Sequence, residues 1–96
     1  MAVDIPVHVS AVAVAEVDCF IKNLSLSGAL VKSDCDLRLH TLIDVRIESP
    51  PPTARVAFVQ AHIARKLQEG LGIEWCEFAP NIVKDLLQSP SVRLPL

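Results

Sequence analysis

Hydrophobic and polar residues alternate along several short stretches of this chain, and a period of two is typical of β-strands with one buried face. The clearest stretch runs from Ile43 to Glu48, where three aliphatic residues alternate with three charged ones. The same alternation recurs from Val17 to Lys22. These patterns predict short antiparallel strands that each turn one face toward a shared core.

Further strands are predicted from apolar, β-branched runs that lie between turn residues. In one run, residues 7–14, the side chains of Val7, Val9, Ala11 and Ala13 share a face. A brief strand is predicted at 29–31 and a proline-rich loop at 49–52. A strand at 55–65 is predicted to be buried over most of its length. After a turn at 68–70, a strand at 71–78 completes a hairpin and carries a core residue, Trp75.

Only the end of the chain has helical periodicity. Residues 80–89 carry aliphatic side chains at helical spacing, with Pro80 suited to the first helical position and Pro90 ending the helix. A helix this short is not stable alone, so it must dock on the rest of the domain. Leu86 and Leu87 are expected to anchor it.

Together these elements predict one domain over residues 1–96, of the mainly β class. We expect a small antiparallel β-barrel over about residues 7–78, followed by a C-terminal α-helix over about 80–89. A chain of 96 residues falls in the size range of a single domain.

Charge and composition exclude several functions. Nine Lys and Arg residues are spread without a cluster and the net charge is −2, which argues against nucleic-acid binding. No apolar run is long enough to cross a bilayer, and residues 1–6 lack the basic start of a secretory signal, so a cytoplasmic protein is expected. Hydrophobic residues make up 51% of the chain. That excess fits either a core of small residues or an apolar face for a partner or a homodimer.

Candidate catalytic and metal-binding residues are scattered. A triad of Ser25 with a histidine and Asp34, or a thiol nucleophile at Cys19, lacks any motif that would bring its members together. An odd number of separated cysteines argues against disulfides and zinc. We therefore predict no enzyme, no catalytic residues and no metal site from Cys19, Cys35, Cys76, His8, His40 and His62.

The segment from Asn23 to Gly28 is the most informative motif. Asn and Ser side chains build tight turns, and glycine permits a positive φ, so an ordinary hairpin turn explains it locally. In its context, however, the segment resembles the signature of the PilZ family, an Asp or Asn followed at fixed spacing by Ser and Gly. Asn23, Ser25 and Gly28 match that signature. The order of the elements over residues 7–89 is also similar to that family.

The resemblance implies a six-stranded barrel and a role in bacterial cyclic di-GMP signalling, with Asn23, Ser25 and Gly28 as the ligand-binding residues. Family members that bind the nucleotide also carry two arginines just before the first strand. Here the first arginine is Arg38, and residues 1–6 offer only the charge of Asp4. Losing one charged hydrogen bond per arginine weakens binding by about 3–6 kcal/mol, which is roughly a hundredfold to ten-thousandfold.

Two functions therefore remain open. The first is a PilZ-like adaptor of type IV pilus, motility or virulence pathways that needs no cofactor. It would bind a protein partner, such as a pilus motor or a signalling enzyme, and bind cyclic di-GMP weakly or not at all. The alternative is a cyclic di-GMP receptor that uses the motif with a cation at a non-standard position. Lys22 and His8 do not stand at the matching spacing, which leaves the candidates Arg38, Arg46, Arg55 and Arg65. Binding of a peptide along an exposed strand edge is a further form of the adaptor hypothesis.

Overall fold

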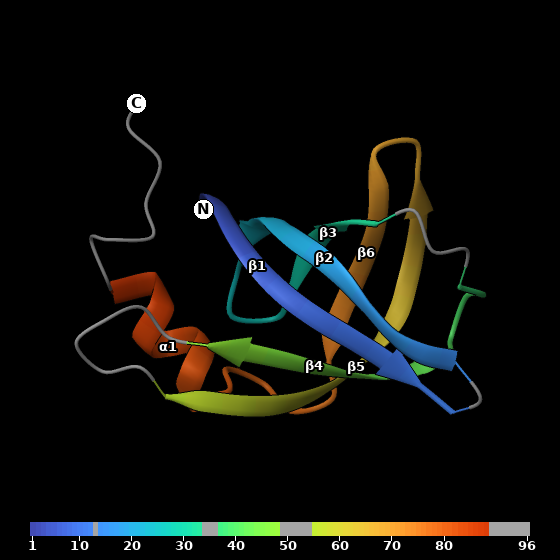
Figure 1. Ribbon diagram of the computed structural model, residues 1–96. Helices are drawn as coiled ribbons and strands as arrows, with labels where there is room; N and C mark the ends of the chain where they lie inside the picture. Colours follow the sequence, from blue (N-terminus) through green and yellow to red (C-terminus); the bar gives the residue numbers. More distant parts are fainter. Residues whose placement is uncertain (13, 34–36, 49–54, 89–96) are drawn as a thin grey trace.

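The computed structural model describes residues 1–12, 14–33, 37–48 and 55–88 (Figure 1). Its strands form one closed antiparallel barrel in the order β1-β2-β3-β6-β5-β4, and a single helix follows. This confirms the predicted fold class. The elements are β1 (Ala2–Ala11), β2 (Val14–Leu24), β3 (Gly28–Lys32), β4 (Leu42–Glu48), β5 (Val56–Leu67), β6 (Gly70–Trp75) and α1 (Asn81–Gln88).

The first strand closes the barrel because it pairs on both sides. Val9 of β1 lies opposite Val17 of β2 and opposite Val45 of β4. Alternate residues of β1, β2, β4 and most of β5 point into a common interior, as the alternation of the sequence predicted for β2 and β4. The core contains buried side chains from all six strands and from the helix, among them Ile21, Val31, Ile47, Ile63, Ile73 and Leu86.

The first strand is longer at its start than predicted. It begins at Ala2 instead of Val7, because Val3 and Ile5 continue the same inward alternation. Pro6 lies inside this strand although proline has no N–H to donate to a neighbouring strand. The position tolerates it because the pairing of β1 with β4 ends at Val7, the next residue. The strand also stops at Ala11, so Val14 belongs to β2 and not to the predicted 7–14 strand.

The prediction that residues 55–65 are buried over most of their length was wrong. In β5 only Val59, Ala61 and Ile63 are fully buried, whereas Val56 and Phe58 are exposed. A barrel has a single interior, so a strand buries alternate residues however apolar its sequence is. The predicted loop at 49–52, Ala13, and the chain after residue 88 lie outside the described residues.

The helix lies at one end of the barrel, near the end of β4 and the start of β5 in the view of Figure 1. Ile82, Val83 and Leu86 are buried in the common core, while Leu87 is only half-buried. The Pro80 carbonyl accepts a hydrogen bond from Lys84 N at 3.0 Å. Pro80 is therefore the N-cap residue of the helix. The first helical residue is Asn81, one position later than predicted.

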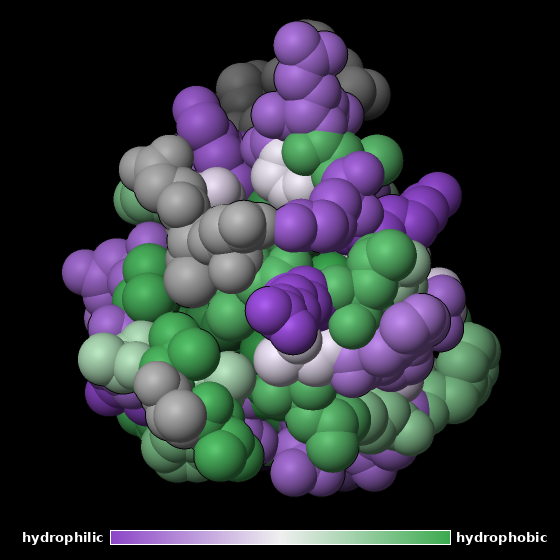
Figure 2. Space-filling model, turned by 90° about the vertical axis from the view of Figure 1, so that its right-hand side faces the viewer, coloured by the Kyte–Doolittle hydropathy of each residue, from purple (hydrophilic) through white to green (hydrophobic). Residues whose placement is uncertain are grey.

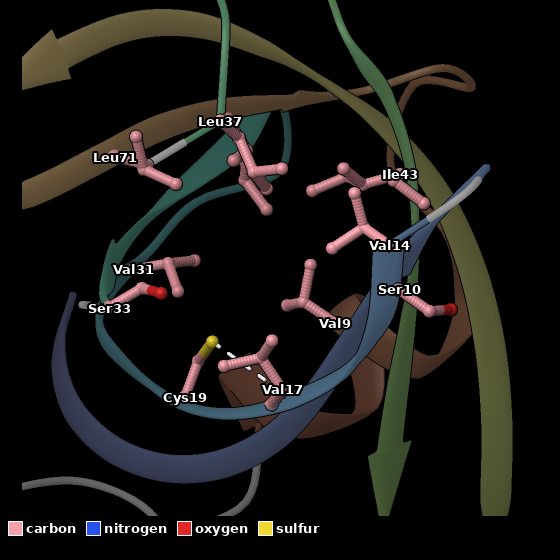
Figure 3. A pocket seen from close by; sticks show the side chains of 12 residues that line it. Val9, Ser10, Val14, Val17, Cys19, Val31, Ser33, Leu37, Ile43 and Leu71 are labelled. Atoms are coloured by element: carbon pink, nitrogen blue, oxygen red, sulfur yellow. Dashed lines mark hydrogen bonds between the residues drawn. The ribbon is translucent and has the colours of Figure 1, made fainter. Parts of the chain in front are cut away.

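Apolar side chains fill the barrel interior at the end away from the helix (Figure 3). Val9, Val31, Ile43 and Leu71 point toward one another there, and Cys19 lies beside Val17. The remaining cavity has a volume of about 10 Å³, enough for about one water molecule. The interior is thus a packed core and not a site for a large ligand.

Candidate functional site

The turn between β2 and β3 is closed by Ser25 and Gly28. Ser25 N donates to the Gly28 carbonyl at 2.9 Å. The Ser25 hydroxyl donates to the same carbonyl at 3.1 Å and accepts from Gly28 N at 3.2 Å. The serine side chain therefore satisfies both polar backbone groups of Gly28, which is the turn-forming role that the sequence predicted for it.

Trp75 connects this turn to the end of β6. Its indole Nε1 donates to the Ser25 carbonyl at 3.2 Å, and its backbone N donates to the Ser27 carbonyl at 3.0 Å. The Leu26 carbonyl accepts from Ala79 N at 3.0 Å, just before the helix. Trp75 itself is buried, which confirms its predicted place in the core. The motif turn is thus held by the strand that precedes the helix.

Gly28 is needed for a different reason from the one predicted. Among the described glycines only Gly70 has a positive φ, so Gly28 does not serve as a positive-φ turn residue. A Cβ on Gly28 would instead stand 2.0 Å from the Ile73 carbonyl oxygen. Glycine is required there because β6 passes too close for any side chain.

The structure brings Asn23, Ser25 and Gly28 together along one hollow on the outer face of the barrel. We call it the motif hollow. Asn23 lies opposite Ala2 and Leu30, and its Oδ1 accepts a hydrogen bond from Met1 N at 3.0 Å. The hollow is lined by Asn23, Ser25, Ser27, Gly28, Ala29, Leu30, Arg65, Leu67, Gly72, Ile73 and Glu74.

Arg65 is the cation of the motif hollow, and of the four candidate arginines it alone lines it. It lies opposite Gly72, where a Cβ would stand 3.4 Å from the Arg65 Nε. The Arg65 side chain therefore lies over β6 at this glycine, at about van der Waals distance from the place of a Cβ. In the part of the chain that the structure describes, Arg65 has no ion-pair partner, whereas Arg46 pairs with Glu16 at 2.9 Å.

A β-bulge puts Arg65 on the outer face. Ile63 lies opposite Ile73, but Arg65 lies opposite Gly72, so the register shifts by one residue between them. Without that shift Arg65 would share the inward face with Ile63. The sequence contains no clear sign of the bulge, and so it left four arginines open as candidates.

The other proposed substitutes for the missing arginine pair lie elsewhere. Lys22 Nζ contacts Asp4 Oδ1 at 2.7 Å, and His8 Nδ1 lies 2.6 Å from Asp18 Oδ1. Neither residue lines the motif hollow. Arg55 is also engaged, because its Nη2 lies 3.3 Å from Asp85 Oδ2 on the helix.

Comparison with known proteins identifies the family to which this chain belongs. The family model for the PilZ domain matches residues 1–89, so this chain belongs to the PilZ family. Domains of this family are generally non-enzymatic binding or adaptor modules of cyclic di-GMP-related signalling. Neither a curated protein nor a solved structure gives a match. In the described ranges, no helix has the length and hydrophobicity to cross a membrane.

Proposed function

We propose that this chain is a non-enzymatic adaptor of bacterial cyclic di-GMP-related signalling, which acts through protein contacts and binds the nucleotide weakly or not at all. The processes it serves would be type IV pilus function, motility or virulence, in the cytoplasm. Its partner would be a pilus motor or a signalling enzyme. Membership of the PilZ family supports the signalling context, and two features of the structure support the adaptor role.

The first and decisive feature is that the motif is already satisfied from within. The Ser25 hydroxyl is hydrogen-bonded to both the carbonyl and the N–H of Gly28. The Ser25 carbonyl accepts a hydrogen bond from the indole of Trp75. The nucleotide carries two phosphates, while among the described residues the lining of the motif hollow includes one cation, Arg65, and also a carboxylate, Glu74. A hollow with this balance lacks the paired charge that bidentate recognition of phosphates and guanines requires.

The second feature is an apolar surface at the end of the barrel away from the helix. Val12, Val14, Leu39 and Leu42 are exposed there, at the turn between β1 and β2 and around the start of β4. Figure 2 shows hydrophobic side chains on this end, interspersed with hydrophilic ones. Exposed apolar patches on small proteins mark contact surfaces. The closed barrel offers no free strand edge in its described strands, so binding by strand addition is not supported.

A calorimetric titration with cyclic di-GMP, followed also by Trp75 fluorescence, tests the first feature. We expect no saturable binding up to high micromolar nucleotide.

Capture of partners from a bacterial extract, with wild type and a Leu42→Glu variant, tests the second feature, the apolar surface. A partner that binds wild type and Phe58→Glu, but not Leu42→Glu, would support the adaptor role. Tight nucleotide binding together with no specific partner would overturn it, and a dimer on size-exclusion chromatography would assign the apolar end to self-association.

The position of Arg65 favours one second candidate, a cyclic di-GMP receptor with an unusual cation. Arg65 lines the same hollow as all three signature residues. If it replaces the missing pair, calorimetry should show low-micromolar binding that falls about 10–150-fold in Arg65→Ala, from the loss of one charged hydrogen bond. Arg46→Ala is the matched control, because Arg46 lies on the outer face but away from this hollow.

A further inference from the structure

The motif turn holds the segment that joins β6 to the helix. The carbonyls on either side of Leu26 accept hydrogen bonds from Trp75, and the Leu26 carbonyl itself accepts one from Ala79 N at 3.0 Å. The backbone of Leu26 therefore lies beside that of Ala79, the residue that follows Phe78. Two segments that are distant in the sequence meet at this point.

Each of these two segments exposes an apolar side chain close to the place where they meet. Phe78 is 77% exposed and Leu26 is 40% exposed. We call these two residues the Leu26–Phe78 pair. An aromatic side chain in water contributes nothing to the core of the domain, and aromatic residues are enriched in the buried centres of protein interfaces. The pair is therefore a candidate contact surface.

The backbone next to Phe78 is strained. Ala79 has a φ of 53°, the left-handed conformation that residues with a side chain avoid. Ala79 also precedes Pro80, and a residue before proline prefers an extended conformation. The hydrogen bond to the Leu26 carbonyl holds Ala79 in place. Strained conformations of this kind cluster at functional positions, and here the strain accompanies the exposure of a phenylalanine.

The same turn also lines the motif hollow, which supplies a charge near the Leu26–Phe78 pair. The residues on either side of Leu26 line this hollow, and so does Arg65. Arg65 is exposed and has no ion-pair partner in the described part of the chain. The carboxylate in the described lining, Glu74, has its Oε2 at 3.7 Å from His62 Nε2. The guanidinium of Arg65 is thus available to an anionic group.

We propose that the Leu26–Phe78 pair and Arg65 form one contact surface for a protein segment that carries a hydrophobic side chain near a single carboxylate. The hydrophobic side chain packs on the pair, and the carboxylate accepts two parallel hydrogen bonds from the guanidinium of Arg65. A phosphorylated segment is disfavoured, because a phosphate group carries nearly two negative charges and Glu74 lines the same hollow. The inference rests on the adaptor function and adds a second contact surface with the chemistry of its partner.

A phage-displayed library of random twelve-residue peptides, selected on the wild-type protein, provides the probe. We expect the enriched peptides to share one Asp or Glu within a few residues of an aromatic or aliphatic residue. In fluorescence anisotropy, Phe78→Ser should weaken binding of an enriched peptide at least tenfold and Arg65→Ala about 10–150-fold, from the loss of one charged hydrogen bond. Phe58→Ser and Arg46→Ala are matched controls that should keep wild-type affinity, because Phe58 is 71% exposed and neither residue lines the motif hollow.

The inference is overturned if no family of peptides is enriched, if Phe78→Ser or Arg65→Ala binds as wild type does, or if the two controls lose as much affinity. Tighter binding when phosphoserine replaces the acidic residue would also overturn it, as would loss of peptide binding in Leu42→Glu alone. Far-UV circular dichroism checks that each variant folds. If Phe78→Ser still captures a bacterial partner that Leu42→Glu loses, the adaptor function stands and only this inference fails. Tight binding of cyclic di-GMP without any specific partner would remove both.

Discussion

The docking of the helix allows a quantitative test, because two adjacent leucines differ in burial. Leu86 is 1% exposed and belongs to the common core, whereas Leu87 is half-buried at its edge. Truncating a fully buried leucine to alanine costs about 2–5 kcal/mol, from lost transfer free energy and the cavity left behind. We expect Leu86→Ala to lower the free energy of unfolding by this amount and Leu87→Ala to lower it by less than about 2 kcal/mol.

For a domain of this size each kcal/mol shifts the melting temperature by about 4–8 °C, so Leu86→Ala should lower it by roughly 8–40 °C. Urea unfolding at fixed temperature gives the free energies directly, and Lys84→Ala, an exposed change on the same helix, should stay within about 0.5 kcal/mol of wild type. An unchanged melting temperature for Leu86→Ala, or equal losses for both leucine variants, would refute the docked position of the helix.

Three further predictions concern the motif turn and the outer face. Gly28→Ala should destabilise the domain by more than about 3 kcal/mol or prevent folding, because the new Cβ would stand 2.0 Å from the Ile73 carbonyl oxygen; soluble yield and urea unfolding measure this. Ser25→Ala should cost about 1–3 kcal/mol in the same assay, since it leaves the polar backbone groups of Gly28 without the hydroxyl. Glu16→Gln should cost less than about 1 kcal/mol, and less still in high salt, because its pair with Arg46 is partly exposed.

Much of the barrel could be predicted from local patterns. The inward alternation of Ile43, Val45 and Ile47 specified β4, and the same rule placed Cys19 and Ile21 of β2 in the core. Alternation is a local property, because each side chain of a strand points opposite to its neighbours. The rule failed in β5, where a long apolar sequence was taken as evidence for burial. Exposed Phe58 shows that hydrophobicity alone does not decide which face a residue occupies.

The candidate site depended more on tertiary structure. The sequence was enough to recognise Asn23, Ser25 and Gly28 as a turn motif, because neighbouring residues form the turn between two consecutive strands. The role of Gly28 was misread, since the strand that passes close to it, β6, lies more than forty residues further along the chain. The hydrogen bond from Trp75 to Ser25 has the same origin, because it joins the turn to β6.

By itself the sequence determined the strand content, the terminal helix, the family signature and the absence of an arginine before Arg38. These are local facts, since periodicity and motif spacing are properties of neighbouring residues. Only the tertiary structure decided that Arg65 faces the motif hollow and that Lys22, Lys32 and Lys66 line one surface. The register of β5 against β6, with its bulge, and the placement of β3 beside β6 bring these distant residues together. Such pairings are selected by the closure of the whole barrel, which no single segment of the chain encodes.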